Sequence, residues 1–230
     1  METGKATYIF DLDGTLVDSM DVAVGVLLGI LDSHSISYSN DIVKTIVPLG
    51  FRGVADYYIK TFALKESSEE IYAEIIDRLV YEYSNRVQPK QTVEKTLREL
   101  KARGFSLNIL TASAHELIDP CIQRLGWENL FDNIWSAEDF NLKKSEPYVF
   151  LEAAKKLGLD PGDCWMVDDN LIALTSAKKA GLKVAGVYDS YSGEYVKEIR
   201  EIADAYFGKM EEILSLDIWR RNKKIICKRM

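Results

Sequence analysis

The segment ATYIFDLDGTLVDS, residues 6–19, constrains the fold more than any other part of the chain. An apolar run that suits a buried strand ends at Asp11 and Asp13, two carboxylates separated by one residue, and Gly14 and Thr15 then turn the chain. Like charges at the end of a strand repel each other and disfavour their own ionised forms. A folded protein that keeps both acids there either leaves them as solvated or capping acids at the strand end or holds a cation nearby to neutralise them.

Apolar runs that suit buried strands alternate with helical patterns along most of the chain. The expected strands are Thr7–Phe10, Ser106–Leu110, Asn133–Trp135, Cys164–Val167, Val184–Val187 and Ala205–Phe207. The expected helices between them are Thr92–Arg103, Pro147–Leu157 and Leu171–Ala180, each followed by a glycine. This alternation predicts an α/β fold, a Rossmann-like parallel sheet with helices on both faces.

The alternation is interrupted once, after the first strand. The stretch up to Thr92 is helical in pattern and offers no convincing strand. Its expected helices are Ser19–Ser33, Asp41–Val47, Gly53–Phe62 and Ser68–Asn85. This predicts a small all-helical cap domain, residues 18–86, inserted into a core domain of residues 1–17 and 87–230. Ligands of open parallel sheets bind beyond the carboxyl ends of the strands, so an insertion there would cover the site.

Polar side chains gather directly after the predicted strands. They are Asp11 and Asp13, then Thr111 and Ser113, then Lys143 and Lys144 ahead of Pro147, and finally Asp168 and Asp169. The ends of parallel strands meet at one edge, so these groups should converge. Carboxylates without His or Cys favour a hard ion, and Mg²⁺ is the natural candidate. A cation, a lysine, a hydroxyl and a spare carboxylate together indicate phosphoryl transfer.

Four segments resemble the ordered motifs of the haloacid dehalogenase superfamily. These are FDLDGTLVDS, LNILTAS, KKSEPYVF and WMVDDN. The helical insertion is similar to the α-helical cap of the subfamily that contains phosphoglycolate phosphatases and β-phosphoglucomutase. The resemblance covers nearly the whole chain and implies a Mg²⁺-dependent phosphatase.

The resemblance also implies a role for each matching residue. Asp11 would be the nucleophile that forms an aspartyl-phosphate, and Asp13 the general acid and base. Thr111 and the Ala112 amide would hold phosphoryl oxygens. Lys144, which fits the third motif better than Lys143, would pair with the phosphoryl group and Asp11. The implied metal site comprises Asp11, Asp13 through its backbone carbonyl, Asp168 and Asp169, and the implied substrate contacts include Thr15, Ala112, Ser113, Arg52 and His115.

Several of these positions allow a second interpretation. Asp168 could instead cap the helix at Leu171, and Ser145 replaces the usual proline of the third motif, which would leave the lysine loop less constrained. Arg52, in the glycine-flanked LGFRG segment, could lie in an interhelix loop that contacts substrate or in a plain turn. His115 could be an ordinary surface residue, and Asp18 is expected to cap a helix of the insertion.

The residue types at two positions bear on the reaction. An acid at Asp13 suits ester chemistry, whereas dehalogenases and phosphonatases of this superfamily lack one. Sugar phosphomutases of this type carry a histidine where this chain has Ala23, so net hydrolysis of a small phosphate monoester is favoured over a phosphomutase. Two functions without turnover also fit parts of the pattern, a receiver-like regulatory protein and a non-catalytic binder of phosphorylated ligands. Steady Mg²⁺-dependent phosphate release would distinguish the enzyme from both.

Net charge and composition limit the classes of partner that the chain can have. The formal net charge is −7, yet residues 216–230 carry six basic residues against one acid, so the rest of the chain is strongly acidic. A chain with so acidic a main part is expected to bind nucleic acid poorly. The basic segment 216–230 is expected to be a solvated terminus. Three cysteines without paired spacing, no signal-peptide pattern and no apolar run long enough for a bilayer predict a cytoplasmic protein without membrane contacts. A monomer or weak homodimer acting on a small phosphorylated metabolite is expected, and the substrate itself has no sequence signal.

Overall fold

The structure, a computed structural model, describes residues 7–39 and 41–216. A parallel six-stranded sheet in the order β3-β2-β1-β4-β5-β6 forms its centre. The strands are β1 (Thr7–Phe10), β2 (Ser106–Thr111), β3 (Asn133–Ser136), β4 (Cys164–Asp168), β5 (Lys183–Val187) and β6 (Ala205–Phe207). Phe10 at the end of β1 lies between Ile109 of β2 and Val167 of β4. The residues that follow these three strands therefore start from one edge of the sheet.

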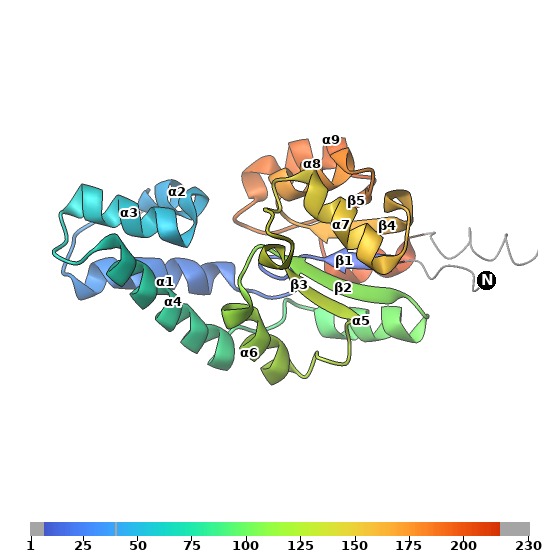
Figure 1. Ribbon diagram of the computed structural model, residues 1–230, viewed down its shortest axis with the longest axis horizontal. Helices are drawn as coiled ribbons and strands as arrows, with labels where there is room; N and C mark the ends of the chain where they lie inside the picture. Colours follow the sequence, from blue (N-terminus) through green and yellow to red (C-terminus); the bar gives the residue numbers. More distant parts are fainter. Residues whose placement is uncertain (1–6, 40, 217–230) are drawn as a thin grey trace, which may run out of the picture. The chain divides into compact units, whose positions relative to one another are not determined.

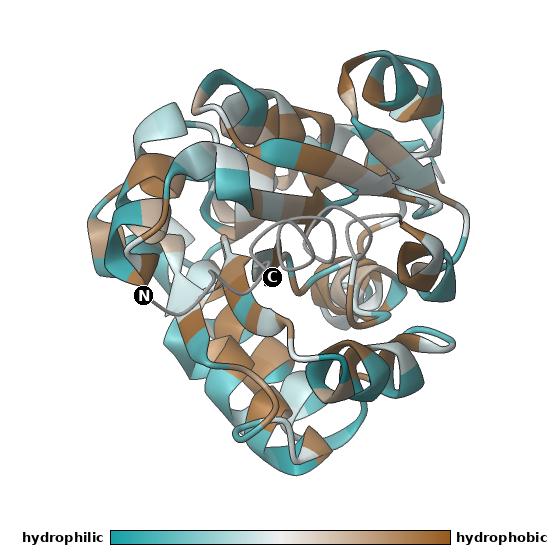
Figure 2. Cartoon of the chain, turned by 90° about the vertical axis from the view of Figure 1, so that its right-hand side faces the viewer, coloured by the Kyte–Doolittle hydropathy of each residue, from teal (hydrophilic) through white to brown (hydrophobic). Residues whose placement is uncertain are grey.

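The strands are apolar because both faces of the sheet are covered by helices (Figure 1). Ile9, Met166 and Val184 pack on one face against α7 (Pro147–Leu157), α8 (Leu171–Lys179) and α9 (Val196–Ile202). Helix α5 (Val93–Ala102) packs against β2 and against the 3-10 helix η5 (Met210–Ser215), which also contacts β6. Figure 2 shows hydrophobic segments running along the strands. The α/β fold predicted from the alternating pattern is thus confirmed.

The inserted segment is helical, and one helix from later in the sequence joins its helices. They are α1 (Met20–Ser33), α2 (Ile42–Ile46), α3 (Gly50–Phe62), α4 (Ser68–Asn85) and α6 (His115–Leu125). The short 3-10 helices are η1 (Val47–Leu49), η2 (Ala137–Phe140), η3 (Pro161–Asp163) and η4 (Gly193–Tyr195). A reciprocal capping box between Ser67 and Glu70 starts α4, and the Tyr58 hydroxyl of α3 donates to the Leu27 carbonyl of α1 at 3.0 Å.

The chain divides into two compact units. The helical unit comprises Asp18–Gln88 together with His115–Leu125. The core unit comprises Pro89–Ala114 and the described residues within 1–17 and 126–230, and it contains the whole sheet. Helix α6 belongs to the helical unit because it packs along α4, although it lies between two strands of the core in sequence. No helix in the described ranges is both long enough and apolar enough to cross a bilayer.

The expected break in the helical pattern at LGFRG is present but shorter than predicted, because it lies at Gly50 and the next helix begins three residues earlier than the expected Gly53. Gly50 has a φ of 66°, and helix α3 begins there and runs through Arg52 without a loop. Gly53 stays inside the helix, where a Cβ would lie only 3.0 Å from the Leu49 Cβ. Gly50 therefore marks the break between η1 and α3, whereas Gly53 and Arg52 lie inside the helix.

Candidate active site

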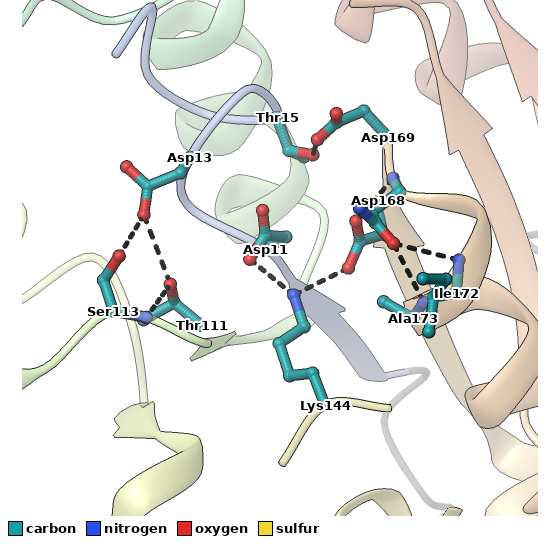
Figure 3. Close-up of polar contacts among 11 residues, drawn as sticks. Asp11, Asp13, Thr15, Thr111, Ser113, Lys144, Asp168, Asp169, Ile172 and Ala173 are labelled. Carbon is teal, nitrogen blue, oxygen red and sulfur yellow. Dashed lines mark hydrogen bonds and ion pairs between the residues drawn. The ribbon is translucent and has the colours of Figure 1, made fainter. Parts of the chain in front are cut away.

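Lys144 lies between two carboxylates at the carboxyl edge of the sheet (Figure 3). Its Nζ is 2.5 Å from Oδ1 of Asp11, which follows β1, and 2.7 Å from Oδ2 of Asp168, the last residue of β4. All three side chains are at most 9% exposed. Lys143, by contrast, is exposed. Of the two neighbouring lysines, Lys144 is therefore the one that reaches the acids.

Asp168 is fixed by the start of helix α8. Its Oδ1 accepts a hydrogen bond from the Asn170 amide at 2.8 Å, while Oδ2 faces Lys144. The cap of α8 is Asn170, whose Oδ1 accepts from the amides of Ile172 and Ala173 at 2.9 and 3.2 Å. Asp168 is therefore not the cap of this helix, and its side chain faces the site.

The loop that carries Lys144 is held by hydrogen bonds even though Ser145 replaces a proline. The Ser176 hydroxyl of α8 donates to the Ser145 carbonyl at 2.7 Å, and the Glu146 amide donates to the Lys143 carbonyl at 2.9 Å. Pro147 then starts α7 at its first turn. These contacts hold the loop on both sides of Lys144, and the expectation that Ser145 leaves it less constrained than a proline would stays a prediction.

Asp13 points away from Lys144, toward the end of β2. Its Oδ2 accepts hydrogen bonds from the Ser113 hydroxyl at 2.7 Å and from the Thr111 hydroxyl at 3.4 Å. The Ser113 amide in turn donates to Thr111 Oγ1 at 3.1 Å, and Ala112 between them is exposed. Figure 3 shows this group on one side of Asp11 and the contact of Lys144 with Asp168 on the other.

Asp169 completes the cluster on the side of the turn after β1. Its Oδ1 accepts a hydrogen bond from the buried Thr15 hydroxyl at 2.9 Å. Gly14 has a φ of 77°, and a Cβ placed on it would lie 2.9 Å from that same oxygen. Only glycine allows the turn to approach this carboxylate so closely.

The electrostatics of the cluster show that Lys144 alone does not neutralise the acids around it. Burial, together with the charges of the other aspartates, raises the pKa of Asp11 well above its usual range despite the opposing charge of Lys144. Burial and the charges of Asp168 and Asp189 raise the pKa of Asp169 to about 7. Burial alone would lower the pKa of Lys144, but the two carboxylates beside it outweigh that effect and raise it. One lysine therefore leaves the acids with excess negative charge.

The donor set fits a divalent metal ion. Asp11, Asp168 and Asp169 each offer a carboxylate oxygen, and these oxygens lie within 4.8 Å of one another. All three residues are buried, and oxygen-only donors suit a hard cation. A cation bound there would remove the repulsion that raises the pKa values of Asp11 and Asp169.

Two predicted substrate residues lie in the helical unit. Arg52, on α3, is exposed, pairs with Glu69 at 2.5 Å and lies over the Tyr72 ring. His115 starts α6, and its Nδ1 lies 2.8 Å from Asp119 Oδ1. The expectation that Asp18 caps a helix of the insertion is wrong, because Ser19 holds the cap position of α1. The contacts of Arg52 and His115 with a substrate stay predictions.

Sequence reasoning missed two residues next to the cluster. Asp189 follows β5 just as Asp168 ends β4, so the rule that polar groups gather after strands would have found it. Lys90 pairs with Asp189 at 2.8 Å from the segment that returns from the insertion. Nothing in the local pattern around Lys90 signals this contact, because its partner is distant in sequence.

The sequence and fold both have known relatives. Residues 8–187 match the family model described as haloacid dehalogenase-like hydrolase. Pyrophosphatase PpaX of Bacillus velezensis is 30% identical over 215 residues, covering 90% of this chain and 94% of that protein. A phosphoglycolate phosphatase of Psychrobacter arcticus is 25% identical over 207 residues, covering 86% of this chain and 89% of that protein.

Two solved structures illustrate the shared fold. A predicted phosphoglycolate phosphatase from Haemophilus somnus superposes with a TM-score of 0.78 at 21% identity, covering 94% of this chain and 99% of that one. A protein from Thermotoga maritima assigned as a beta-phosphoglucomutase gives a TM-score of 0.76 at 21% identity, covering 91% and 97%. At this identity the likeness concerns the fold alone.

Proposed function

The chain belongs to the haloacid dehalogenase-like hydrolase family, and from this premise we propose that it is a Mg²⁺-dependent phosphatase that hydrolyses a small phosphate monoester through an aspartyl-phosphate. The observation that carries the proposal is the buried contact of Lys144 with Asp11 and Asp168 beside Asp169. A positive charge and a metal-binding set of acids around one buried carboxylate suit attack on phosphorus, where opposing charges must be offset.

In the first half of the proposed reaction, a carboxylate oxygen of Asp11 attacks the phosphorus in line with the leaving oxygen. A bond forms between Asp11 and phosphorus, the bond from phosphorus to the substrate oxygen breaks, and Asp13 gives its proton to that oxygen. Lys144 offsets charge on the phosphoryl oxygens. The Thr111 hydroxyl and the Ala112 amide hold these oxygens during the transfer.

In the second half, Asp13 takes a proton from water, and the water oxygen attacks the same phosphorus. The bond from Asp11 to phosphorus breaks, which restores the carboxylate and releases inorganic phosphate. The Ser113 hydroxyl, 2.7 Å from Asp13 Oδ2, holds the side chain that must act as acid in one half and base in the other.

The metal would be held by Asp11, Asp168, Asp169 and the backbone carbonyl of Asp13. When bound, Mg²⁺ supplies positive charge that offsets the phosphoryl oxygens and favours the ionised form of Asp11. Asn170 and Thr15 keep their neighbouring carboxylates in place through the hydrogen bonds described above. We further propose that the helical unit serves as the cap, with Arg52 and His115 as its candidate substrate contacts.

The relatives favour a second candidate substrate class. PpaX of Bacillus velezensis is named a pyrophosphatase, and its identity of 30% exceeds that of the Psychrobacter phosphoglycolate phosphatase. In inorganic pyrophosphate the leaving oxygen belongs to a second phosphate, so the bond that breaks is a phosphoanhydride and not an ester, and the same residues would serve. Pyrophosphate and phosphoglycolate are therefore the first two compounds to compare in a screen of phosphorylated metabolites.

The experiment that tests the proposal is Mg²⁺-dependent release of phosphate by the wild type and by Asp11→Asn. The wild type is expected to turn over p-nitrophenyl phosphate steadily and to stop in EDTA. Asp11→Asn keeps the size of the side chain but removes the nucleophile, so turnover should be abolished. Near-normal hydrolysis by this variant would overturn the proposal, and an absence of turnover by the wild type on every compound of the screen would favour a phospho-ligand binder.

A further inference from the structure

Lys90 holds the turn that follows β1. The chain returns to the core unit at Pro89, which pairs with Val17, and the Lys90 amide donates to the Leu16 carbonyl at 2.9 Å. The Lys90 ammonium donates to the Gly14 carbonyl at 2.7 Å. Both the backbone and the side chain of Lys90 therefore fix the turn that contains Gly14.

The other contacts of the Lys90 ammonium tie this turn to the loop after β5. It donates to the Tyr188 carbonyl at 3.1 Å and pairs with Asp189 Oδ2 at 2.8 Å. The Asp189 side chain is 4% exposed, and its Oδ1 accepts from the Tyr191 amide at 2.8 Å. An ammonium has three donors, and all three are used on partners fixed by the backbone or by burial.

The turn that Lys90 holds lies directly against Asp169. The Thr15 hydroxyl donates to Asp169 Oδ1, and a Cβ on Gly14 would collide with the same carboxylate. A displacement of the turn by a few tenths of an ångström would therefore move either the hydrogen bond or the packing that orients Asp169. Groups that orient a metal-binding carboxylate affect metal affinity even though they never touch the ion.

We propose that Lys90, paired with Asp189, is a positioning residue. It holds the Gly14-Thr15 turn in contact with Asp169 and thereby sets the orientation of that carboxylate for metal binding. This rests on the proposed role of Asp169 as a metal ligand. Lys90 touches neither the substrate nor the metal, and its effect passes through Gly14 and Thr15.

The test is the affinity of the intact chain for Mn²⁺ alone, followed by the spectroscopic signal of the free ion. Lys90→Met keeps the aliphatic stem and removes the donors, and it should raise the dissociation constant severalfold, up to about tenfold, which marks the lower end of the loss when a group bonded directly to a metal ligand is removed. Thr15→Val should weaken binding as well. Because both act on Asp169 through the same turn, the double variant should lose clearly less than the product of the two single losses.

Lys178→Met is the control for removal of a paired lysine. Lys178 pairs with Asp204 at 2.6 Å, and the other oxygen of Asp204 accepts a hydrogen bond from the Val184 amide, as Asp189 accepts from the Tyr191 amide. The control pair is the more exposed one, at 42% and 36% against 21% and 4%. The Mn²⁺ affinity of Lys178→Met should stay within about twofold of the wild type, since neither Lys178 nor Asp204 contacts the Gly14-Thr15 turn. If thermal unfolding shows that Lys90→Met does not fold, Lys90→Gln takes its place.

The outcomes separate this inference from the proposed function. If Asp169→Asn weakens Mn²⁺ binding but Lys90→Met binds as the wild type does, Lys90 is not a positioning residue and only this inference fails. Losses that multiply fully in the double variant with Thr15→Val would also overturn it. If the wild type binds no Mn²⁺, or if Asp169→Asn binds it equally well, the metal site fails and this inference with it.

Discussion

Lys144→Met would leave buried acids without their counter-charge. The Lys144 ammonium contacts Asp11 and Asp168 at 2.5 and 2.7 Å, and methionine keeps most of its volume while removing the charge. Removing one partner of a buried ion pair costs about 3–5 kcal/mol. The acids can limit this cost by taking up a proton. For an ordinary aspartate with a pKa of about 3.9 this costs about 4 kcal/mol at pH 7, at about 1.36 kcal/mol per pKa unit.

The pKa of Asp11 is raised, so protonating it at pH 7 costs less free energy than protonating an ordinary aspartate. The expected loss of stability is therefore smaller than about 4 kcal/mol. We expect Lys144→Met to lower the free energy of unfolding by about 3 kcal/mol in EDTA at pH 7. Asp11 of the folded variant binds its proton more tightly than Asp11 of the unfolded chain, because burial raises its pKa and Lys144 no longer opposes this. The deficit of the variant relative to the wild type should therefore shrink as the pH falls from about 8 to about 5.

Urea unfolding followed by tryptophan fluorescence measures this loss. Three of the four tryptophans, Trp127, Trp135 and Trp165, belong to the core unit, and their signal reports the unit that contains Lys144. The fourth, Trp219, lies outside the described residues. Lys178→Met is the control, because its ion pair is 42% and 36% exposed and should contribute at most about 1 kcal/mol. A deficit of Lys144→Met no larger than that of this control, or a deficit that grows toward low pH, would refute the reasoning.

Three further substitutions test other parts of the structure. Thr92 has a φ of 68°, and its hydroxyl is buried without a hydrogen-bond partner among the described residues. Thr92→Gly should therefore raise the free energy of unfolding by about 1 kcal/mol and move the urea midpoint to a higher concentration. A midpoint that falls would contradict this. Gly186→Ala would push a Cβ into side chains of α9 and β6 and should cost about 1–3 kcal/mol, whereas Gly162→Ala, with 3.9 Å to the nearest atom, should cost far less in the same assay. Ser113→Ala removes the shorter of the two hydroxyl contacts to Asp13 and should lower kcat about tenfold with little change in KM. An unchanged kcat would show that Ser113 does not position the acid.

Much of the fold follows from local signals. Strand Thr7–Phe10 and helix Pro147–Leu157 have the bounds expected from the sequence, because an apolar run ends at charged residues in one case and Pro and Gly mark the ends in the other. Helix α6 has no such signal. It has Pro120 in its interior, and it packs on α4, a helix far from it in sequence.

The candidate site was predictable where topology alone decides it. Parallel strands end at one edge, so the clustering of Asp11, Asp168 and Asp169 follows from their places at the ends of β1 and β4. Lys144 comes from the loop between η2 and α7, and strand topology alone does not bring it to the cluster. The direction in which a side chain points does not follow, and the contact of Asp13 with Ser113 depends on the loop after β2. The roles of these residues in catalysis stay predictions.

The central claim is that Asp11 carries the phosphoryl group, and chemical trapping tests it most directly. Enzyme that is turning over p-nitrophenyl phosphate with Mg²⁺ is quenched rapidly in acid and treated with borohydride, which reduces an acyl phosphate to an alcohol but leaves a free carboxylate intact. Mass spectrometry of the peptides then locates the reduced residue. We expect homoserine at position 11, dependent on substrate and Mg²⁺. Homoserine at position 13 or 168, or at no position during steady turnover, would contradict the claim.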